Sequence, residues 1–149
     1  MLTRTVNSRI IKAPRDKVWE AIVDMENWPN WDPTAKNRIV YHHILEKKDN
    51  YVICEEIEQV FGLFKGRHID KYILTPKVKL EETILRGYIS GSLDLAFSDR
   101  PEGTHVTANT EIKAKALWLK IVYFFLGERF LHQFMDEFLG QLASYVESG

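Results

Sequence analysis

A chain of 149 residues is long enough for one domain, which buries roughly 68 to 70% of its unfolded surface. Twenty Lys and Arg against twenty-one Asp and Glu give a net charge of -1, without a run of like charge. This balance argues against a nucleic acid as partner. The single cysteine excludes an internal disulfide, and no signal peptide or glycosylation sequon is recognisable, which favours a cytoplasmic location.

The first elements expected are a strand and a short helix. Residues 3–12 are rich in β-branched side chains, which favour a strand. Pro14 suits the first position of a helix, and Asp16 suits the positive end of its dipole, so a helix is expected to about residue 25. Two prolines in residues 27–33 then predict an irregular corner with one further short helical turn.

Six strands are expected next, because six runs of about ten residues are rich in Val, Ile, Tyr, Phe and Thr and are separated by turn residues. The runs are 38–47, 50–61, 63–74, 78–86, 89–98 and 104–114. Their connections are too short for parallel crossovers, which need a dozen or more residues. Together with the first strand they predict a seven-stranded antiparallel sheet.

The last element expected is one long helix over residues 115–147. Its first half, residues 116–126, is apolar nearly all round and should be covered on most sides, although it is too short to cross a bilayer. Its second half is amphipathic. A straight helix of this length would be about 50 Å long, so Gly127, where the halves meet, is the expected bend. The chain is thus read as one α+β domain, residues 1–149, with a curved sheet around a long C-terminal helix.

Three short segments resemble the N-terminal signature of the START-like (SRPBCC) superfamily, including its polyketide cyclase/dehydrase and coenzyme-Q-binding branches. They are Ile11-Lys-Ala-Pro14, Val18-Trp19 and Trp28-Pro-Asn-Trp-Asp-Pro33. The resemblance implies a helix-grip, START/Bet v 1-like fold, in the order strand, two helices, six strands and helix. Members mostly bind lipids, sterols, polyketides, quinones or other hydrophobic molecules between the sheet and the last helix. The signature is structural and identifies no ligand.

Candidate ligand-binding residues are the aromatic and aliphatic side chains expected to face this cavity, with a few polar residues on the same strand faces. They are Trp28, Trp31, Tyr41, Ile53, Glu55, Ile57, Arg67, Ile84, Arg86, Leu93, Leu95, Trp118, Tyr123, Phe124, Phe134 and Phe138. A charge inside the cavity needs a partner, so Arg67, Arg86 and Tyr41 are expected beside the acidic residues. The alternative is that these polar residues lie on a solvated part of the sheet.

Catalytic and metal-binding patterns are sparse. None of the five histidines has the spacing of a motif such as H-E-x-x-H. His42 and His43 are neighbours on a strand and point to opposite faces, so they cannot bind one ion together. No G-x-S-x-G nucleophile elbow is present. The sequence therefore predicts no catalytic residue, no metal site and no cofactor.

Three functions remain open. The leading hypothesis is a non-catalytic carrier or sensor of a hydrophobic small molecule. The second is a polyketide cyclase- or dehydratase-like enzyme using the same cavity, with Glu55, Glu82 or His43 as the proton-transferring group. The third is a chaperone cofactor or membrane-docking module, in which residues 117–126 contact protein or, transiently, lipid.

Overall fold

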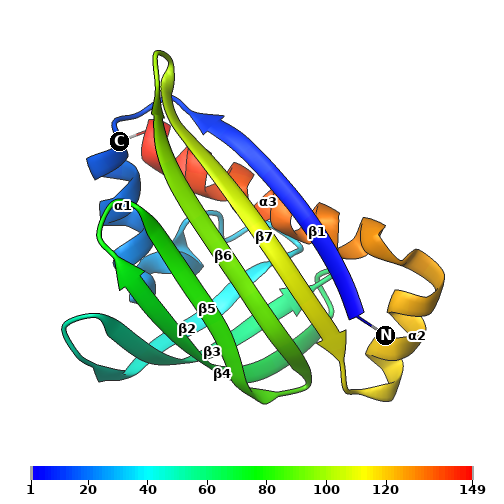
Figure 1. Ribbon diagram of the computed structural model, residues 1–149. Coiled ribbons are helices and arrows are strands. Elements are labelled where there is room, and N and C mark those ends of the chain that lie inside the picture. The colour runs from blue at the N-terminus through cyan, green and yellow to red at the C-terminus, as the bar shows by residue number, and fades with distance from the viewer. Residues whose placement is uncertain (1, 149) are drawn as a thin grey trace.

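One antiparallel sheet and the helices packed on it make up the computed structural model, which describes residues 2–148 (Figure 1). The elements follow in the order β1 (Leu2–Ile11), α1 (Arg15–Val23), the 3-10 helix η1 (Met25–Asn30), β2 (Arg38–Lys47), β3 (Tyr51–Val60), β4 (Phe64–Thr75), β5 (Lys79–Gly87), β6 (Ile89–Arg100), β7 (Gly103–Ala114), α2 (Leu117–Leu126) and α3 (Glu128–Glu147).

The seven strands form a single sheet in the order β1-β7-β6-β5-β4-β3-β2, and all neighbours are antiparallel. The sheet is strongly bent, with β2 to β4 turned relative to β1, β7 and β6, and α3 crosses one of its faces (Figure 1). The expected meander, with the first strand added at its edge, is confirmed, and so is the α+β helix-grip architecture.

Side-chain alternation determines what each strand contributes to the interior. On β3 the even-numbered residues Val52, Cys54 and Glu56 are buried, whereas the residues between them are only half-buried. On β5 the buried residues are Leu80, Glu82 and Ile84. The inner face of β3 is therefore the one opposite to the face that the sequence reading placed in the cavity.

The segment after β1 places an aromatic corner against the sheet. Pro14 precedes α1 with a φ of -62°, and α1 buries Val18, Trp19, Ala21 and Ile22. The following η1 contains Pro29. The indole Nε1 of Trp28 donates a hydrogen bond to the carbonyl of Ile22 at 3.1 Å. This bond fixes the Trp28 ring beneath the sheet, where it contacts Tyr72 and Phe138.

The expected C-terminal helix is broken into two helices at Gly127. That residue has φ 55° and ψ -137°, a conformation that glycine adopts far more readily than other residues. α3 packs along β1 and buries Leu131, Phe138 and Leu142 among others. Within residues 2–148, no helix is both long and apolar enough to span a membrane.

The apolar helix α2 is much more exposed than expected. Only Leu119 and Tyr123 of its ten residues are buried, whereas Leu117, Phe124 and Phe125 are 75%, 74% and 77% exposed. The prediction that this segment is covered on most sides is therefore wrong. The physical reason is the break at Gly127, which lets α2 turn away from the line of α3 at one end of the sheet (Figure 1).

Candidate functional site

A cavity of about 70 Å³ lies between the inner face of the sheet and the two C-terminal helices. Its wall is mostly apolar, and its residues are Trp28, Ile39, Glu56, Glu58, Val60, His68, Tyr72, Glu82, Ile84, Tyr88, Ile89, Leu93, Thr110, Ile112, Leu119, Tyr123, Phe130, Leu131, Phe134, Met135 and Phe138. A cavity of this size has room for only a few water molecules. Small-molecule sites usually measure roughly 300 to 1,000 Å³, so a ligand of that size requires part of the wall to move.

Six of the residues proposed from the sequence line this cavity. They come from five elements and meet across the space between the sheet and the helices. They are Trp28, Ile84, Leu93, Tyr123, Phe134 and Phe138. Their part in ligand binding stays a prediction.

Seven others lie on the outer face of the sheet or in exposed positions. Glu55 forms an ion pair with Arg67, and Ile53 and Ile57 share its face of β3. Tyr41, Arg86 and Phe124 are exposed. The even-numbered residues Val52, Cys54 and Glu56 form the buried face of β3, and side-chain alternation puts the odd-numbered Glu55 and its neighbours on the other face.

Three further proposed residues are buried or half-buried close to the cavity without lining it. Trp31 packs its ring against Trp28 and Phe138. Leu95 is fully buried in the core. Trp118 is half-buried and stacks between Phe64 and Tyr88. All three support the wall from behind.

Ionisable side chains from four adjacent strands form one wall of this otherwise apolar interior. We call this group the carboxylate–histidine cluster. It consists of His42, Glu56, Glu58, His68, Asp70, Tyr72 and Glu82. Its members are neighbours because of the strand register, in which Glu56 is paired with both His42 and His68, and Tyr72 with Glu82. Most of them are buried, and Glu58 is half-buried.

Hydrogen bonds connect the cluster. The Tyr72 hydroxyl donates to Glu56 Oε2 at 2.7 Å, and His68 Nδ1 lies 2.7 Å from Asp70 Oδ1. The Tyr88 hydroxyl donates to Glu58 Oε1. Tyr88 reaches this position because its ring lies over Gly66, where a β-carbon would overlap the ring.

Burial and mutual charge shift the pKa values of this cluster strongly. Burial lowers the pKa of His68, but the charge of Glu56 and the hydrogen bond with Asp70 outweigh burial and raise it to about 12. Burial and the charges of Glu82 and Glu56 raise the pKa of Asp70 to about 11. Burial, followed by the charge of Glu56, raises the pKa of Glu82 to about 8. Asp70 and Glu82 therefore retain their protons at neutral pH.

The sequence reading missed most of this cluster, although one signal for it was present. Glu56 and Glu58 are two residues apart on one strand, and His68, Asp70 and Tyr72 follow the same spacing on the next. Such spacing places polar groups on a single face of each strand. Two facing polar rows in adjacent strands indicate a polar site when their face is the inner one.

The three proposed proton-transferring groups lie in different environments. Glu82 lines the cavity. Glu55 is paired with Arg67 on the outer face, and His43 lies in an exposed pair, with its Nδ1 2.8 Å from Glu26 Oε2. Of these three, only Glu82 is in position to meet a molecule inside the cavity.

Comparisons with known proteins agree with this architecture. A family profile described as polyketide cyclase / dehydrase and lipid transport matches residues 3–147. No match was found among curated protein sequences. Among solved structures, the Zhui aromatase/cyclase from a Streptomyces species is similar with a TM-score of 0.83 at 14% identity, over 99% of this chain and 94% of that one.

Two further structures extend the comparison of the fold. A protein from Thermus thermophilus gives a TM-score of 0.81 at 13% identity, over 99% of this chain and 98% of that one. A START superfamily protein from Mycobacterium smegmatis gives 0.71 at 14% identity, over 97% and 94% of the two chains. At these identities the likeness concerns the fold.

Proposed function

This chain belongs to the polyketide cyclase/dehydrase and lipid transport family, and we propose that it binds a hydrophobic small molecule in the cavity beneath α2. The proposal rests on one observation: the same cavity combines a mostly apolar wall with the buried carboxylate–histidine cluster. Cyclases and lipid carriers both need to hold a hydrophobic molecule, so the proposal concerns the step that the two activities share.

The proposed ligand combines an apolar body with a polar group. Ile84, Leu93, Phe134 and their neighbours offer apolar surface, and each buried methylene of a ligand contributes about 0.8 kcal/mol. Glu82 and the other polar groups of the cavity offer hydrogen bonds at one end. A long-chain acid, a quinone, a sterol or an aromatic polyketide has this chemistry.

Entry of such a ligand requires the wall to open, because the cavity itself is only about 70 Å³. α2 is the wall element best suited to move. Leu119 and Tyr123 are its buried residues, and Gly127 separates it from α3. We propose that α2 moves outward about Gly127 and admits the ligand.

The test is a ligand search on the purified protein. Mass spectrometry of an organic extract identifies bound molecules, and thermal shifts with fatty acids, sterols, quinones and aromatic polyketides rank candidates. Replacing Leu93 by Trp fills the cavity and should weaken binding at least tenfold, about 1.4 kcal/mol. The matched control is Leu85→Trp, because Leu85 is exposed on β5. No extracted molecule and no shift with any class would refute the proposal.

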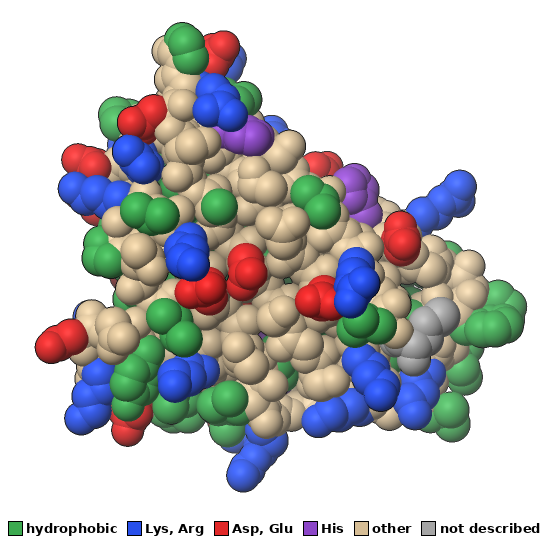
Figure 2. Space-filling model, viewed as in Figure 1, with side chains coloured by type: hydrophobic (Ala, Val, Ile, Leu, Met, Phe, Trp, Pro, Cys, Tyr) green, Lys and Arg blue, Asp and Glu red, His purple; other side chains and the backbone are tan. Residues whose placement is uncertain are grey.

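A second function, docking on a membrane surface, is favoured by the exposed apolar residues of α2 and of the β3–β4 turn. We call this surface the rim patch. It consists of Phe61, Leu63, Phe64, Leu117, Ile121, Phe124, Phe125 and Leu126, all of them exposed. The stacking of Phe64 on Trp118 joins its two parts. Figure 2 shows hydrophobic side chains gathered at the α2 end of the molecule.

The charges beside the rim patch suit an anionic bilayer. Lys113, Lys115 and Lys120 are the charged residues of segment 112–127, and Lys65 is the charged residue of segment 60–66. All four are exposed. Apolar side chains flanked by lysines are typical of segments that bind at a membrane interface. We propose that the protein exchanges its ligand with an anionic membrane through this surface.

A further inference from the structure

We propose that Glu56, Glu58 and His68 form a binding site for a divalent transition-metal ion such as Zn²⁺ at the inner wall of the cavity. The His68 Nε2 atom lies 3.8 Å from Glu56 Oε1 and 3.8 Å from Glu58 Oε2. Donors that share one Zn²⁺, each about 2.0–2.2 Å from it, lie roughly 3 to 4 Å apart. Both distances from Nε2 fall in this range, and one donor atom from each of the three residues lies within 4.8 Å of the others.

The unpartnered nitrogen of His68 is the independent sign of a ligand. His68 is 4% exposed, and its Nε2 has no hydrogen-bond partner among the described residues. Leaving such a nitrogen buried without a partner is unfavourable, because the loss of its hydration is not compensated. A metal ion at the meeting point of His68, Glu56 and Glu58 would satisfy it.

Each of the three donor side chains is also oriented by a hydrogen bond to a further residue. His68 Nδ1 lies 2.7 Å from Asp70 Oδ1, so Nδ1 keeps its proton, and an ion that binds at Nε2 displaces the second proton of the imidazolium. Glu56 accepts a hydrogen bond from Tyr72 through its other oxygen, Oε2. Glu58 does the same with Tyr88 through Oε1. Metal-binding histidines and carboxylates in proteins are usually oriented by outer partners of this kind.

Charge and donor chemistry indicate the class of ion. Histidines are the basic partners in the ion pairs of Glu56, Glu58 and Asp70. A divalent cation would compensate two ionised carboxylates beside a neutral imidazole. An imidazole with two carboxylates suits Zn²⁺, Mn²⁺ or Fe²⁺ better than Ca²⁺ or Mg²⁺. Since all three side chains line the cavity, a further position on the ion would face a bound molecule.

The spacing of the histidines along the sequence does not indicate this site. Here the donors come from two adjacent strands. Glu56 is paired with His68 across the ladder, and Glu58 follows two residues after Glu56. The proposal is independent of the function proposed above, since the ion can bind whether or not a hydrophobic molecule does.

Metal titration of chelator-treated protein tests the proposal. Co²⁺ should bind once per chain and give visible absorption bands, and Zn²⁺ should displace it and raise the melting temperature. Glu58→Gln and His68→Gln should each weaken binding about a hundredfold, and Asp70→Asn about ten- to a hundredfold. The control is His43→Gln, which removes an exposed histidine that is also paired with a carboxylate and should change nothing.

The outcomes are distinct. Loss of binding in Glu58→Gln with an unchanged circular dichroism spectrum supports the site even where His68→Gln is poorly folded. Absence of Co²⁺ and Zn²⁺ binding at millimolar concentrations overturns it. Binding that persists in Glu58→Gln or disappears in His43→Gln places the ion elsewhere, and this also overturns the proposal. Ligand binding without metal binding refutes only the metal site.

Discussion

The ring of Phe64 stacks on the ring of Trp118, with the centroids 5.1 Å apart and the planes inclined by 22°. Phe64 begins β4 and Trp118 lies in the first turn of α2. On its other side Trp118 stacks with Tyr88, whose hydroxyl donates to Glu58. This stack connects the rim patch to the carboxylate–histidine cluster and holds α2 over the cavity.

Phe64→Ala should loosen α2. An aromatic pair contributes about 0.5 to 1.5 kcal/mol beyond the area that it buries, so amide hydrogens of α2 should exchange roughly two to ten times faster in the variant. Leu63→Ala is the control, since Leu63 is the more exposed neighbour in the same turn. Equal exchange in wild type and Phe64→Ala would show that the stack does not hold α2.

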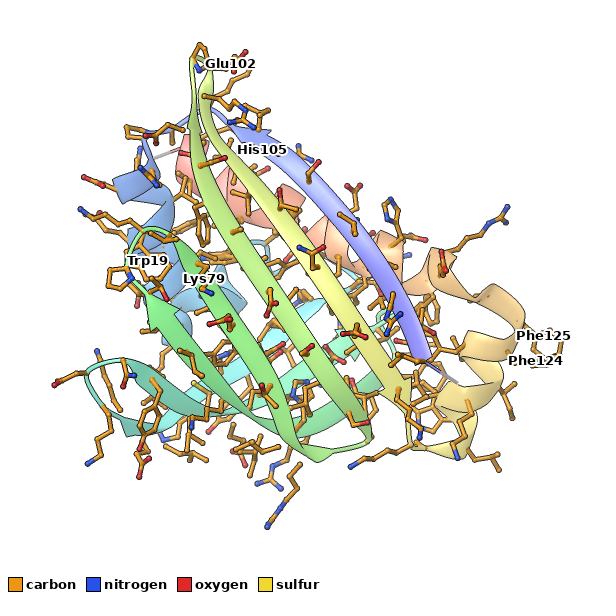
Figure 3. The ribbon with its side chains drawn as sticks, viewed as in Figure 1. Trp19, Lys79, Glu102, His105, Phe124 and Phe125 are labelled. Carbon is orange, nitrogen blue, oxygen red and sulfur yellow. The ribbon has the colours of Figure 1, made fainter. Side chains whose placement is uncertain are left out.

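Phe124→Ser with Phe125→Ser should weaken binding to liposomes that contain anionic lipid. Figure 3 shows both rings pointing away from the body of the protein, so the change should leave the melting temperature nearly unchanged while reducing flotation at least tenfold. The control is Leu45→Ser with Leu85→Ser, two exposed but less accessible apolar residues outside the rim patch, at 52% and 51%. Equal losses in the two double variants would contradict a specific docking surface.

Gly127→Ala should destabilise the connection between α2 and α3. No atom lies within 4 Å of an added β-carbon, so the cost comes from the backbone conformation and should be about 1 to 3 kcal/mol. Gly140→Ala, inside α3, is the matched control and should stabilise by about 0.5 to 1 kcal/mol. Chemical denaturation measures both. If Gly127→Ala leaves the free energy of unfolding unchanged, the chain around residue 127 adopts another conformation at little cost.

Thr110→Val and Thr104→Val should change stability in opposite directions. Both threonines are buried in β7, but Thr110 Oγ1 has no hydrogen-bond partner among the described residues, whereas Thr104 Oγ1 donates to the carbonyl of Ala13 at 2.8 Å. Valine has nearly the same shape. Thr110→Val should therefore gain about 1 kcal/mol in free energy of unfolding and Thr104→Val lose a similar amount. A loss in Thr110→Val would reveal a bound molecule on its hydroxyl.

Glu26 should stabilise the protein only above acidic pH. A backbone hydrogen bond from Ile44 and a hydrogen bond with His43, supported by the nearby charges of His43 and His42, hold the pKa of Glu26 below its ordinary value of 4.5. Because the folded pKa is the lower one, this stabilisation is present above pH 4.5 and is lost as the pH falls through the folded value.

Melting temperatures of wild type and Glu26→Gln should therefore differ at pH 6, and the difference should shrink as the pH falls below 4.5. Glu102→Gln, at the tip of the β6–β7 hairpin (Figure 3), should match wild type at both values. A difference in melting temperature between wild type and Glu26→Gln that stays the same at low pH would contradict the lowered pKa of Glu26.

Local patterns were sufficient to predict the strands and their antiparallel order, because turn residues and connection lengths restrict a meander to few arrangements. They were not sufficient for the side-chain faces of β3. Both faces of that strand mix apolar and acidic residues, so alternation alone does not identify the inner one. Glu55 and Glu56 look alike in the sequence, and only the packing of the folded sheet distinguishes the buried Glu56 from the half-buried Glu55.

The exposure of α2 could not be predicted from local sequence patterns either. Apolar composition predicts burial on average. Phe124 and Phe125 are nevertheless exposed, because the break at Gly127 turns them away from the sheet. Trp28, Tyr123 and Phe138 were placed on the cavity wall from the sequence. They belong to elements with clear amphipathic or corner patterns, whereas the cluster depends on contacts between strands.

The glycine under the Tyr88 ring has a consequence for natural variation. Gly66 leaves the space over which the ring of Tyr88 lies, and that ring carries the hydroxyl bound to Glu58. Positions 66 and 88 should therefore covary in homologous chains, with a residue smaller than tyrosine at 88 wherever 66 bears a side chain. Where that exchange has occurred, the residue at 58 is released to change as well.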